Sequence, residues 1–180
     1  MSGELVEMTV ESVRVHLLSS QHVVILRELD RDRYLPIWIG PWEASAIAMR
    51  LQGVTPERPL THDLLVALLD ELGATVREVV IAELAEETFH ARIRLEIGGR
   101  PVEVDSRPSD ALALAVRTGV RVFAASSVLD RAAVSSDAGR EDEGTDEEGA
   151  GSNEGLAVFR DFINSLDLGD EPGEGPPGRA

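Results

Sequence analysis

The sequence has 180 residues, of which 43% are hydrophobic, and it contains no cysteine, which excludes disulfide bonds and thiolate metal sites. Its formal net charge is −16, and all 17 basic residues are arginine. Residues 1–134 hold 14 Arg against 20 acidic residues, and residues 135–180 hold 3 against 13. This acidity argues against tight, sequence-independent nucleic-acid binding, which usually needs a basic surface, but leaves transient binding at a local site open.

No apolar run in the sequence approaches the roughly 20 residues that a membrane-spanning helix needs. The first residues lack the basic start and apolar stretch of a signal peptide. We therefore expect a soluble, cytoplasmic protein with no membrane partner.

The first 40 residues predict an antiparallel meander of three strands. Apolar and polar residues alternate between Met8 and Leu17, with a change of phase near Glu11 and Ser12 that is typical of a β-bulge. Runs of β-branched and apolar residues at 21–29 and 34–39 predict the second and third strands.

Two helices are expected next. Pro41 and Glu43 suit the first turn of a helix that runs to about Gln52. Thr61 is a suitable N-cap for a second helix at 62–72. The leucines of that helix form one apolar stripe, which we expect to be buried: Leu64, Leu65, Leu68, Leu69 and Leu72.

The next segments predict three strands and a buried helix. The strands lie at 75–84, 88–97 and 100–105, and a Gly-Gly turn joins the last two. Residues 111–116 are apolar on every side, so the helix that they form must be buried. We expect Ser109 or Asp110 to cap it. A short strand at 120–124 and a short helical segment at 128–133 complete the domain.

The composition changes abruptly after residue 134. Residues 135–155 are acidic and rich in Gly and Ser, and residues 169–180 are rich in Gly and Pro, so both predict disorder. Between them, residues 156–168 have the apolar spacing of a short amphipathic helix. The predicted fold class is α+β, a largely antiparallel sheet with three main helices over residues 1–134, followed by this tail.

Charged residues gather where the predicted helices begin. One segment offers Arg58, His62 and Asp63, the other Asp105, Arg107 and Asp110, and Glu43 stands at the start of a third helix. Hydrolysis of a phosphodiester needs a positioned water, a group that takes its proton, and positive charge for the phosphate. Carboxylates that hold a divalent metal, or a histidine base with an arginine clamp, would supply these.

A purely structural role is open for each of these residues. Asp63 and Asp110 are favourable in first helical turns whatever the function. Arg107 can form an ion pair that fastens a corner of the fold, and a histidine at the position of His62 more often packs than acts as a base. Trp38 could stack on a base, although a core or dimer contact is favoured. Together the two charged segments carry more weight, because they can converge on one cleft.

Short motifs follow one another along the chain: L-P-I-W-I-G at 35–40, E-A at 43–44, A-I at 46–47, R-P-L-T-H-D-L-L at 58–65, T-F-H-A-R-I at 88–93, V-D-S-R-P-S-D-A-L-A-L-A at 104–115 and V-L-D at 128–130. In this combination and order they resemble the bifunctional nuclease domain family over roughly residues 6–134. The resemblance implies a compact α+β domain that self-associates as a homodimer or higher homo-oligomer. It also implies cleavage of phosphodiester bonds in both DNA and RNA.

Site residues for such an activity come from the charged segments. The catalytic candidates are His62, Asp63, Asp105 and Asp110; the substrate-binding candidates are Arg58, Arg107 and Ser109; and Asp105 and Asp110 are the candidate ligands of a divalent metal, Mg²⁺ or Mn²⁺. The expected partner is a transiently bound nucleic acid.

The alternative function is a non-enzymatic regulatory or protein-interaction module, which the acidic domain and acidic tail favour. In this hypothesis the tail mimics a nucleic acid, or the helix at 156–166 docks on a partner or on its own domain.

Overall fold

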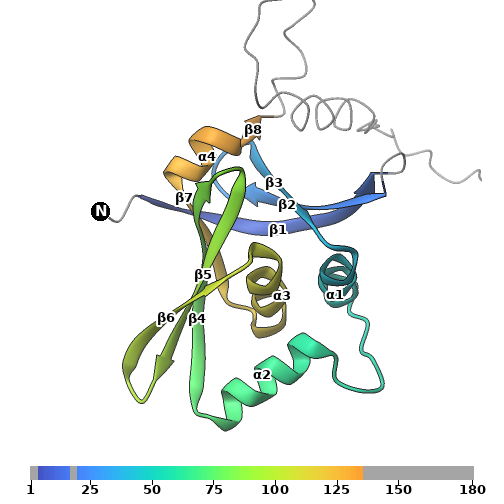
Figure 1. Ribbon diagram of the computed structural model, residues 1–180, viewed down its shortest axis with the longest axis vertical. Helices are drawn as coiled ribbons and strands as arrows, with labels where there is room; N and C mark the ends of the chain where they lie inside the picture. The colour runs from blue at the N-terminus through green and yellow to red at the C-terminus, as the bar shows by residue number, and fades with distance from the viewer. Residues whose placement is uncertain (1–3, 17–19, 136–180) are drawn as a thin grey trace, which may run out of the picture. The chain divides into compact units, whose positions relative to one another are not determined.

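A computed structural model of the chain describes residues 4–16 and 20–135. Within these residues it holds eight strands and four helices, in the order β1-β2-β3-α1-α2-β4-β5-β6-α3-β7-α4-β8 (Figure 1). The predicted linker at 135–155 (apart from its first residue), the helix at 156–168 and the tail at 169–180 lie outside the described residues.

The first three strands form the predicted antiparallel meander. They are β1 (Leu5–His16), β2 (Gln21–Glu28) and β3 (Arg33–Ile39). The pairing register between β1 and β2 shifts between Val10 and Ser12, which confirms the predicted bulge.

A second antiparallel meander consists of β4 (Ala74–Ala85), β5 (Thr88–Ile97) and β6 (Arg100–Ser106). The short strand β7 (Arg121–Ala125) pairs antiparallel with β1 and parallel with β4, and so joins both meanders. The result is one eight-stranded sheet in the order β6-β5-β4-β7-β1-β2-β3-β8. The two-residue strand β8 (Val134–Ser135), which the sequence did not predict, pairs with β3. The predicted α+β class with a largely antiparallel sheet is confirmed.

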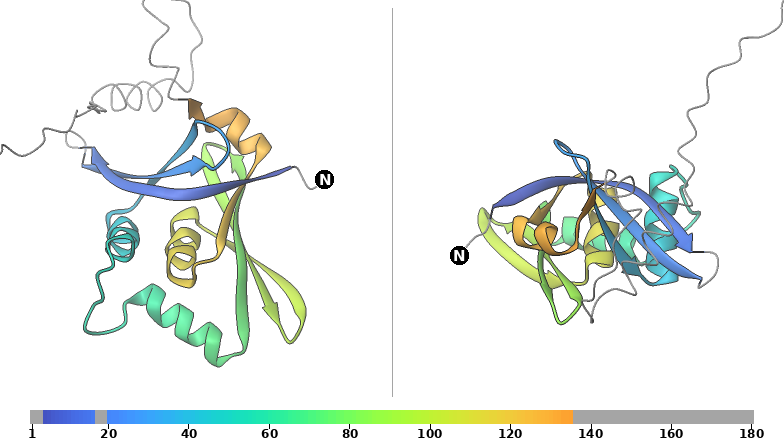
Figure 2. Two further views of the ribbon diagram at one scale, coloured as in Figure 1. Left: turned by 180° about the vertical axis from the view of Figure 1, so that it is seen from behind. Right: turned by 90° about the horizontal axis from the view of Figure 1, so that it is seen from above.

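The central helix is α3 (Pro108–Thr118). It contacts α1 (Pro41–Leu51), α2 (Thr61–Glu71), β4 and β5, and Figures 1 and 2 show it in the corner between the two meanders. Ala111, Leu112, Ala113 and Leu114 are all 0% exposed, which confirms the predicted burial. The fourth helix, α4 (Ser126–Ala132), follows β7 directly. No helix in the described ranges combines the length and apolarity needed to cross a membrane.

The predicted N-caps are wrong by one residue or more. Thr61 is the first residue of α2, and the backbone N–H of Leu60 donates to Asp63 Oδ2 at 2.8 Å. Arg107 holds the N-cap position of α3, with no side-chain capping bond from Ser109 or Asp110. In α3 the physical reason is Pro108, whose fixed φ suits the first helical position. The N-cap is therefore the residue before it, Arg107.

The predicted burial of the α2 leucines is wrong for four of the five. Leu64 is 55%, Leu68 50% and Leu72 74% exposed, and Leu65 is 36% exposed. Leu69 is the member of the stripe that packs against the core. The reason is that α2 packs mainly on α3 and β4, which cover only a narrow side of the helix.

Burial of α3 predicts a large difference between two leucine truncations. Leu112→Ala removes a side chain that is 0% exposed and should lower the free energy of unfolding by about 2–5 kcal/mol. Leu68→Ala, at a position 50% exposed, should change it by about 0.5 kcal/mol or less. Urea unfolding measures both values, and equal losses would contradict the placement of α3 at the centre. If Leu112→Ala does not fold, Leu112→Met allows the comparison, with an expected loss under about 1.5 kcal/mol.

Candidate functional site

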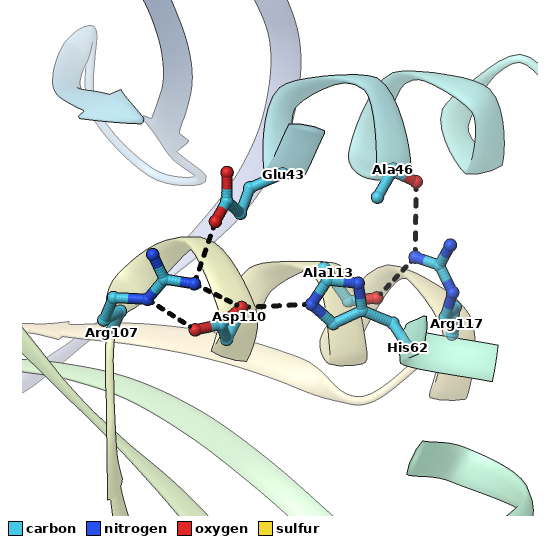
Figure 3. A network of polar contacts seen from close by, with 7 residues as sticks. All are labelled: Glu43, Ala46, His62, Arg107, Asp110, Ala113 and Arg117. Carbon is cyan, nitrogen blue, oxygen red and sulfur yellow. Dashed lines mark hydrogen bonds and ion pairs between the residues drawn. The ribbon is translucent and has the colours of Figure 1, made fainter. Parts of the chain in front are cut away.

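Four side chains meet where α1 and α3 begin, and together we call them the Arg107 cluster: Glu43, His62, Arg107 and Asp110 (Figure 3). Arg107 donates through Nε to Asp110 Oδ2 at 2.7 Å and through Nη2 to Asp110 Oδ1 at 3.1 Å. The same Nη2 donates to Glu43 Oε1 at 2.8 Å. His62 Nε2 lies 3.1 Å from Asp110 Oδ1. The cluster therefore ties three helices together at one point.

Two helices reach this cluster by the same local pattern. Pro41 and Pro108 each occupy the first helical position, and Glu43 and Asp110 each stand two residues later. A carboxylate in the first turn is favourable because the helix dipole is positive there. Arg107 stands between the two carboxylates and compensates one of their two negative charges.

Exposure differs strongly within the cluster. The side chain of Arg107 is 66% exposed, whereas those of Asp110, Glu43 and His62 are 31%, 17% and 10% exposed. Nη1 of Arg107 makes none of the contacts found among the described residues, and Figure 3 shows it directed away from Asp110. The cluster thus presents a guanidinium to solvent, with two carboxylates behind it.

His62 is the most buried member. Its Nδ1 is buried and has no hydrogen-bond partner within the described part of the chain. A proton on Nδ1 would be an unsatisfied buried donor, so we assign the proton to Nε2, which donates it to Asp110. In this arrangement His62 orients Asp110 and fastens α2 to α3, and its second nitrogen does not face solvent.

The charge state of Asp110 follows from its surroundings. Burial of the carboxyl group raises the pKa of Asp110. Hydrogen bonds from Arg107 and His62 lower that pKa by more than burial raises it, so the net pKa lies below the ordinary value. Hydrogen bonds to Asp110 and Glu43 raise the pKa of the Arg107 guanidinium. The pair is therefore ionised at neutral pH.

Asp63, predicted to be catalytic, lies in a different ion pair. Its Oδ1 accepts a 2.6 Å hydrogen bond from Nε of Arg117, while its Oδ2 accepts from Leu60. Arg117 is 6% exposed and also donates to the carbonyl oxygens of Ala46 and Ala113 (Figure 3). Burial raises the pKa of Asp63, but the bonds from Leu60 and Arg117 prevail and leave the pKa lowered. Both oxygens of Asp63 are thus occupied by structural contacts.

Asp105 lies on the other face of the sheet. It stands opposite Arg92 in the β5–β6 pairing and forms an ion pair with it. Arg92 alternates along β5 with the buried residues Ala91 and Ile93, which face the core with α3. The structure therefore does not bring Asp105 together with Asp110, the other half of the predicted metal pair.

The two remaining predicted residues, Arg58 and Ser109, lie at different distances along the chain from the cluster, and only Ser109 is next to it in sequence. Arg58 is exposed and makes no contact with the Arg107 cluster among the described residues. Ser109 is 6% exposed and begins α3 directly beside Arg107. Glu43 is the residue whose role the sequence did not assign. Its signal was the proline two residues earlier, which repeats the spacing of Pro108 and Asp110.

The predicted divalent metal has no obvious ligand set in the described residues. No group of three or more His, Asp or Glu side chains converges there in a way that could hold a metal ion. Mg²⁺ or Mn²⁺ therefore remains a prediction from sequence, and no step proposed below passes through a metal.

These observations define an α+β domain whose buried central helix begins at an arginine held between two carboxylates. The chain belongs to the bifunctional nuclease domain family, whose model matches residues 24–137. This confirms the resemblance of the sequence motifs.

Relatives at two levels of similarity accompany this match. An uncharacterised protein of Mycobacterium tuberculosis is 41% identical over 160 residues, which cover 89% of this chain and 94% of the relative. Bifunctional nuclease 1 of Oryza sativa subsp. japonica and a bifunctional nuclease of Oryza minuta are each 25% identical over 114 residues. These cover 61% of this chain and 34% of either plant protein.

The lowered pKa of Asp110 predicts how stability depends on pH. Its ionised carboxylate stabilises the fold above the pKa of an unfolded aspartate, about 3.9. That contribution is lost as the pH falls through the lower pKa of the folded protein. Asp110→Asn should therefore unfold at lower urea concentration than the wild type at pH 7, and the difference should shrink below about pH 4.

Urea midpoints measured between pH 7 and pH 3 check this expectation. Asp70→Asn, at an exposed position of α2, is the control and should track the wild type. A gap between wild type and Asp110→Asn that does not change with pH would contradict the assigned ion pair.

Proposed function

We propose that this protein is a nuclease that hydrolyses phosphodiester bonds in DNA and RNA, and that the phosphate binds at the Arg107 cluster. The observation that carries the proposal is the guanidinium of Arg107, which is 66% exposed and held by two carboxylates at the start of two helices. The names of the two plant relatives support the activity.

The binding step uses Nη1 of Arg107, which makes no hydrogen bond to any of the described residues. Nε and Nη2 are fixed by Asp110 and Glu43, so Nη1 is available to donate to a non-bridging phosphate oxygen. A guanidinium with its plane already fixed loses little conformational freedom when the phosphate binds. The positive ends of α1 and α3 add to the attraction for an anion.

The proton-accepting step fits Glu43 better than Asp110. Asp110 accepts three hydrogen bonds and its pKa is lowered, so its carboxylate is a weak base. Glu43 uses Oε1 for its bond to Arg107, and no hydrogen bond to Oε2 is found among the described residues. We assign Glu43 Oε2 to take a proton from a water whose oxygen attacks phosphorus, while the bond to the leaving oxygen breaks and that oxygen takes a proton from solvent water.

The other predicted residues take roles that depend on this assignment. His62 and Asp110 become positioning residues, since they hold Arg107 and do not face the substrate. Ser109 keeps a substrate contact. The catalytic role predicted for Asp105 is tested below, and the roles predicted for Asp63 and Arg58 are not part of this mechanism.

The phosphate assignment predicts the effect of Arg107→Gln. Loss of the guanidinium should reduce cleavage of single-stranded DNA and RNA by about 10²–10³-fold, as for other groups that stabilise developing charge. Arg121→Gln is the matched control, because Arg121 is 67% exposed and lies outside the cluster. Equal activity of the two variants would overturn the assignment, and absence of cleavage by pure wild-type protein would overturn the nuclease proposal.

Each assay should be run with Mg²⁺, with Mn²⁺ and with a chelator. Loss of activity in the chelator would support the predicted divalent metal. Full activity in the chelator would contradict that prediction.

Gly40 offers a test of Glu43 that does not change Glu43 itself. An added Cβ at Gly40 would lie 2.4 Å from Glu43 Oε2, so Gly40→Ala must displace that carboxylate. The φ of Gly40 is −71°, which alanine adopts without strain. We expect Gly40→Ala to keep its thermal stability and to lose most of the activity that Glu43→Gln loses, about 10²–10⁴-fold.

Asp105→Asn serves as the opposing variant in this series, because Asp105 lies on the other face of the sheet. It should keep wild-type activity. If Asp105→Asn is inactive while Gly40→Ala is fully active, the reaction takes place elsewhere than at the Arg107 cluster.

The alternative function, a regulatory or protein-interaction module, is favoured by one observation. The leucines of α2 form an exposed apolar face, and such faces often mark interaction sites. The same face is the natural candidate for the predicted homodimer or higher homo-oligomer. A wild-type protein that forms oligomers but cleaves nothing, with or without metal, would favour the module.

A further inference from the structure

A cavity of about 280 Å³ opens beside the Arg107 cluster. Its walls come from the end of β3, the start of β5 and the first residues of α3. Ile37, Ile39 and Phe89 supply apolar walls, and Glu87, Arg107 and Ser109 are among the polar ones. The candidate phosphate site and an apolar cavity therefore share one residue, Arg107.

Strand alternation shows which aromatic side chain faces this cavity. Phe89 stands two residues before the fully buried Ala91 and packs against the core, so both lie on the inner face of β5. Ile37 and Ile39 share the inner face of β3, which places the side chain of Trp38 on the outer face. Trp38 also lines the cavity, but from the strand face that points away from the core, so we take Phe89 as the aromatic surface of its inner wall.

Ser109 supplies a polar group on the cavity wall. It is 6% exposed, it lines the cavity, and no hydrogen bond of its side chain is found within the described residues. Its Oγ is not among the fully buried atoms that lack a partner, which in the described part of the chain are His62 Nδ1 and Ser106 Oγ. The hydroxyl is therefore open to the cavity, where it can donate to or accept from the polar edge of a ligand.

We propose that this cavity binds one nucleobase of a single-stranded nucleic acid whose phosphate is held by Arg107. The proposal rests on the function proposed above and specifies its substrate. A flat ring can stack on Phe89 between the isoleucines, while its polar edge meets the hydroxyl of Ser109. Because that hydroxyl both donates and accepts, we expect little preference among the bases.

The size of the cavity limits how many bases it can bind, and base pairing limits which nucleic acids can enter it. A volume of about 280 Å³ lies just below the range of roughly 300–1,000 Å³ for sites of drug-sized ligands, so the cavity suits one base and not two. A base that is paired and stacked in a duplex cannot enter without being unpaired first. Single strands are therefore the expected substrate.

The binding test uses saturation-transfer NMR of full-length protein with adenosine 5′-monophosphate, ribose 5-phosphate and inorganic phosphate. The base protons of the nucleotide should receive more saturation than its ribose protons, and the nucleotide should bind about tenfold more tightly than ribose 5-phosphate. Equal affinities, or saturation confined to the ribose, would overturn the proposal.

Two matched variants locate the base. Phe89→Leu keeps an apolar side chain but loses the ring, and it should weaken nucleotide binding about tenfold without changing the binding of ribose 5-phosphate. Phe123→Leu makes the same change on β7, where the ring packs under Arg121 at 5.3 Å, and should leave both affinities unchanged. Ser109→Ala should weaken nucleotide binding severalfold. If both phenylalanine variants behave alike, the base does not bind at Phe89.

Cleavage of matched single-stranded and duplex DNA separates this proposal from the nuclease proposal. Single strands should be cleaved at least about tenfold faster, and Phe89→Leu should raise KM with little change in kcat. Base-dependent nucleotide binding without any cleavage would contradict the nuclease proposal and still support the proposal that the cavity binds a base. Cleavage that neither prefers single strands nor responds to Phe89→Leu would sink the cavity assignment alone.

Discussion

The burial of α3 is the constraint on which the rest of the structure depends. Its middle residues, Ala111 to Leu114, are 0% exposed, so apolar surface must surround the helix on every side. The sheet, α1 and α2 provide that surface. The half-buried carboxylate of Asp110 and the buried guanidinium of Arg117, near the two ends of α3, lose contact with water and are compensated by partners of opposite charge. The ion pairs of Arg107 and Arg117 are the outcome.

Each end of α3 has an arginine in an ion pair, but the two arginines differ in their exposure to solvent. At one end Arg117 is 6% exposed, and its guanidinium is occupied by Asp63 and two backbone carbonyl groups. At the other end Arg107 is 66% exposed, and its Nη1 makes no hydrogen bond to the residues that the structure describes. Both arginines join helices, but of the two only the guanidinium of Arg107 is exposed to solvent. This difference in exposure, more than residue type, separates a candidate site from a structural link.

Local patterns predicted the elements well, and long-range relations limited the prediction of the site. The alternation in β1, its bulge and the apolar run of α3 depend on near neighbours in sequence, and all three are confirmed. Periodicity identified the apolar side of α2 but not whether another element covers it. The face of Asp105 depends on its partner Arg92, and the pairing of Glu43 with Arg107 joins residues 64 positions apart. The sequence brought His62 and Asp110 into one hypothesis, and the structure places them in contact.

The position of β7 has a consequence for how the chain reaches this fold. Within the described residues, one edge of β1 and one edge of β4 pair only with β7, which is residues 121–125. During synthesis both edges therefore stay open until most of the domain has left the ribosome. The two meanders can form early as local hairpins, but closing the sheet requires contacts across more than a hundred residues, the kind of closure that slows folding. The nascent chain can therefore become a single cooperative unit only after residues 121–125 have paired with both meanders.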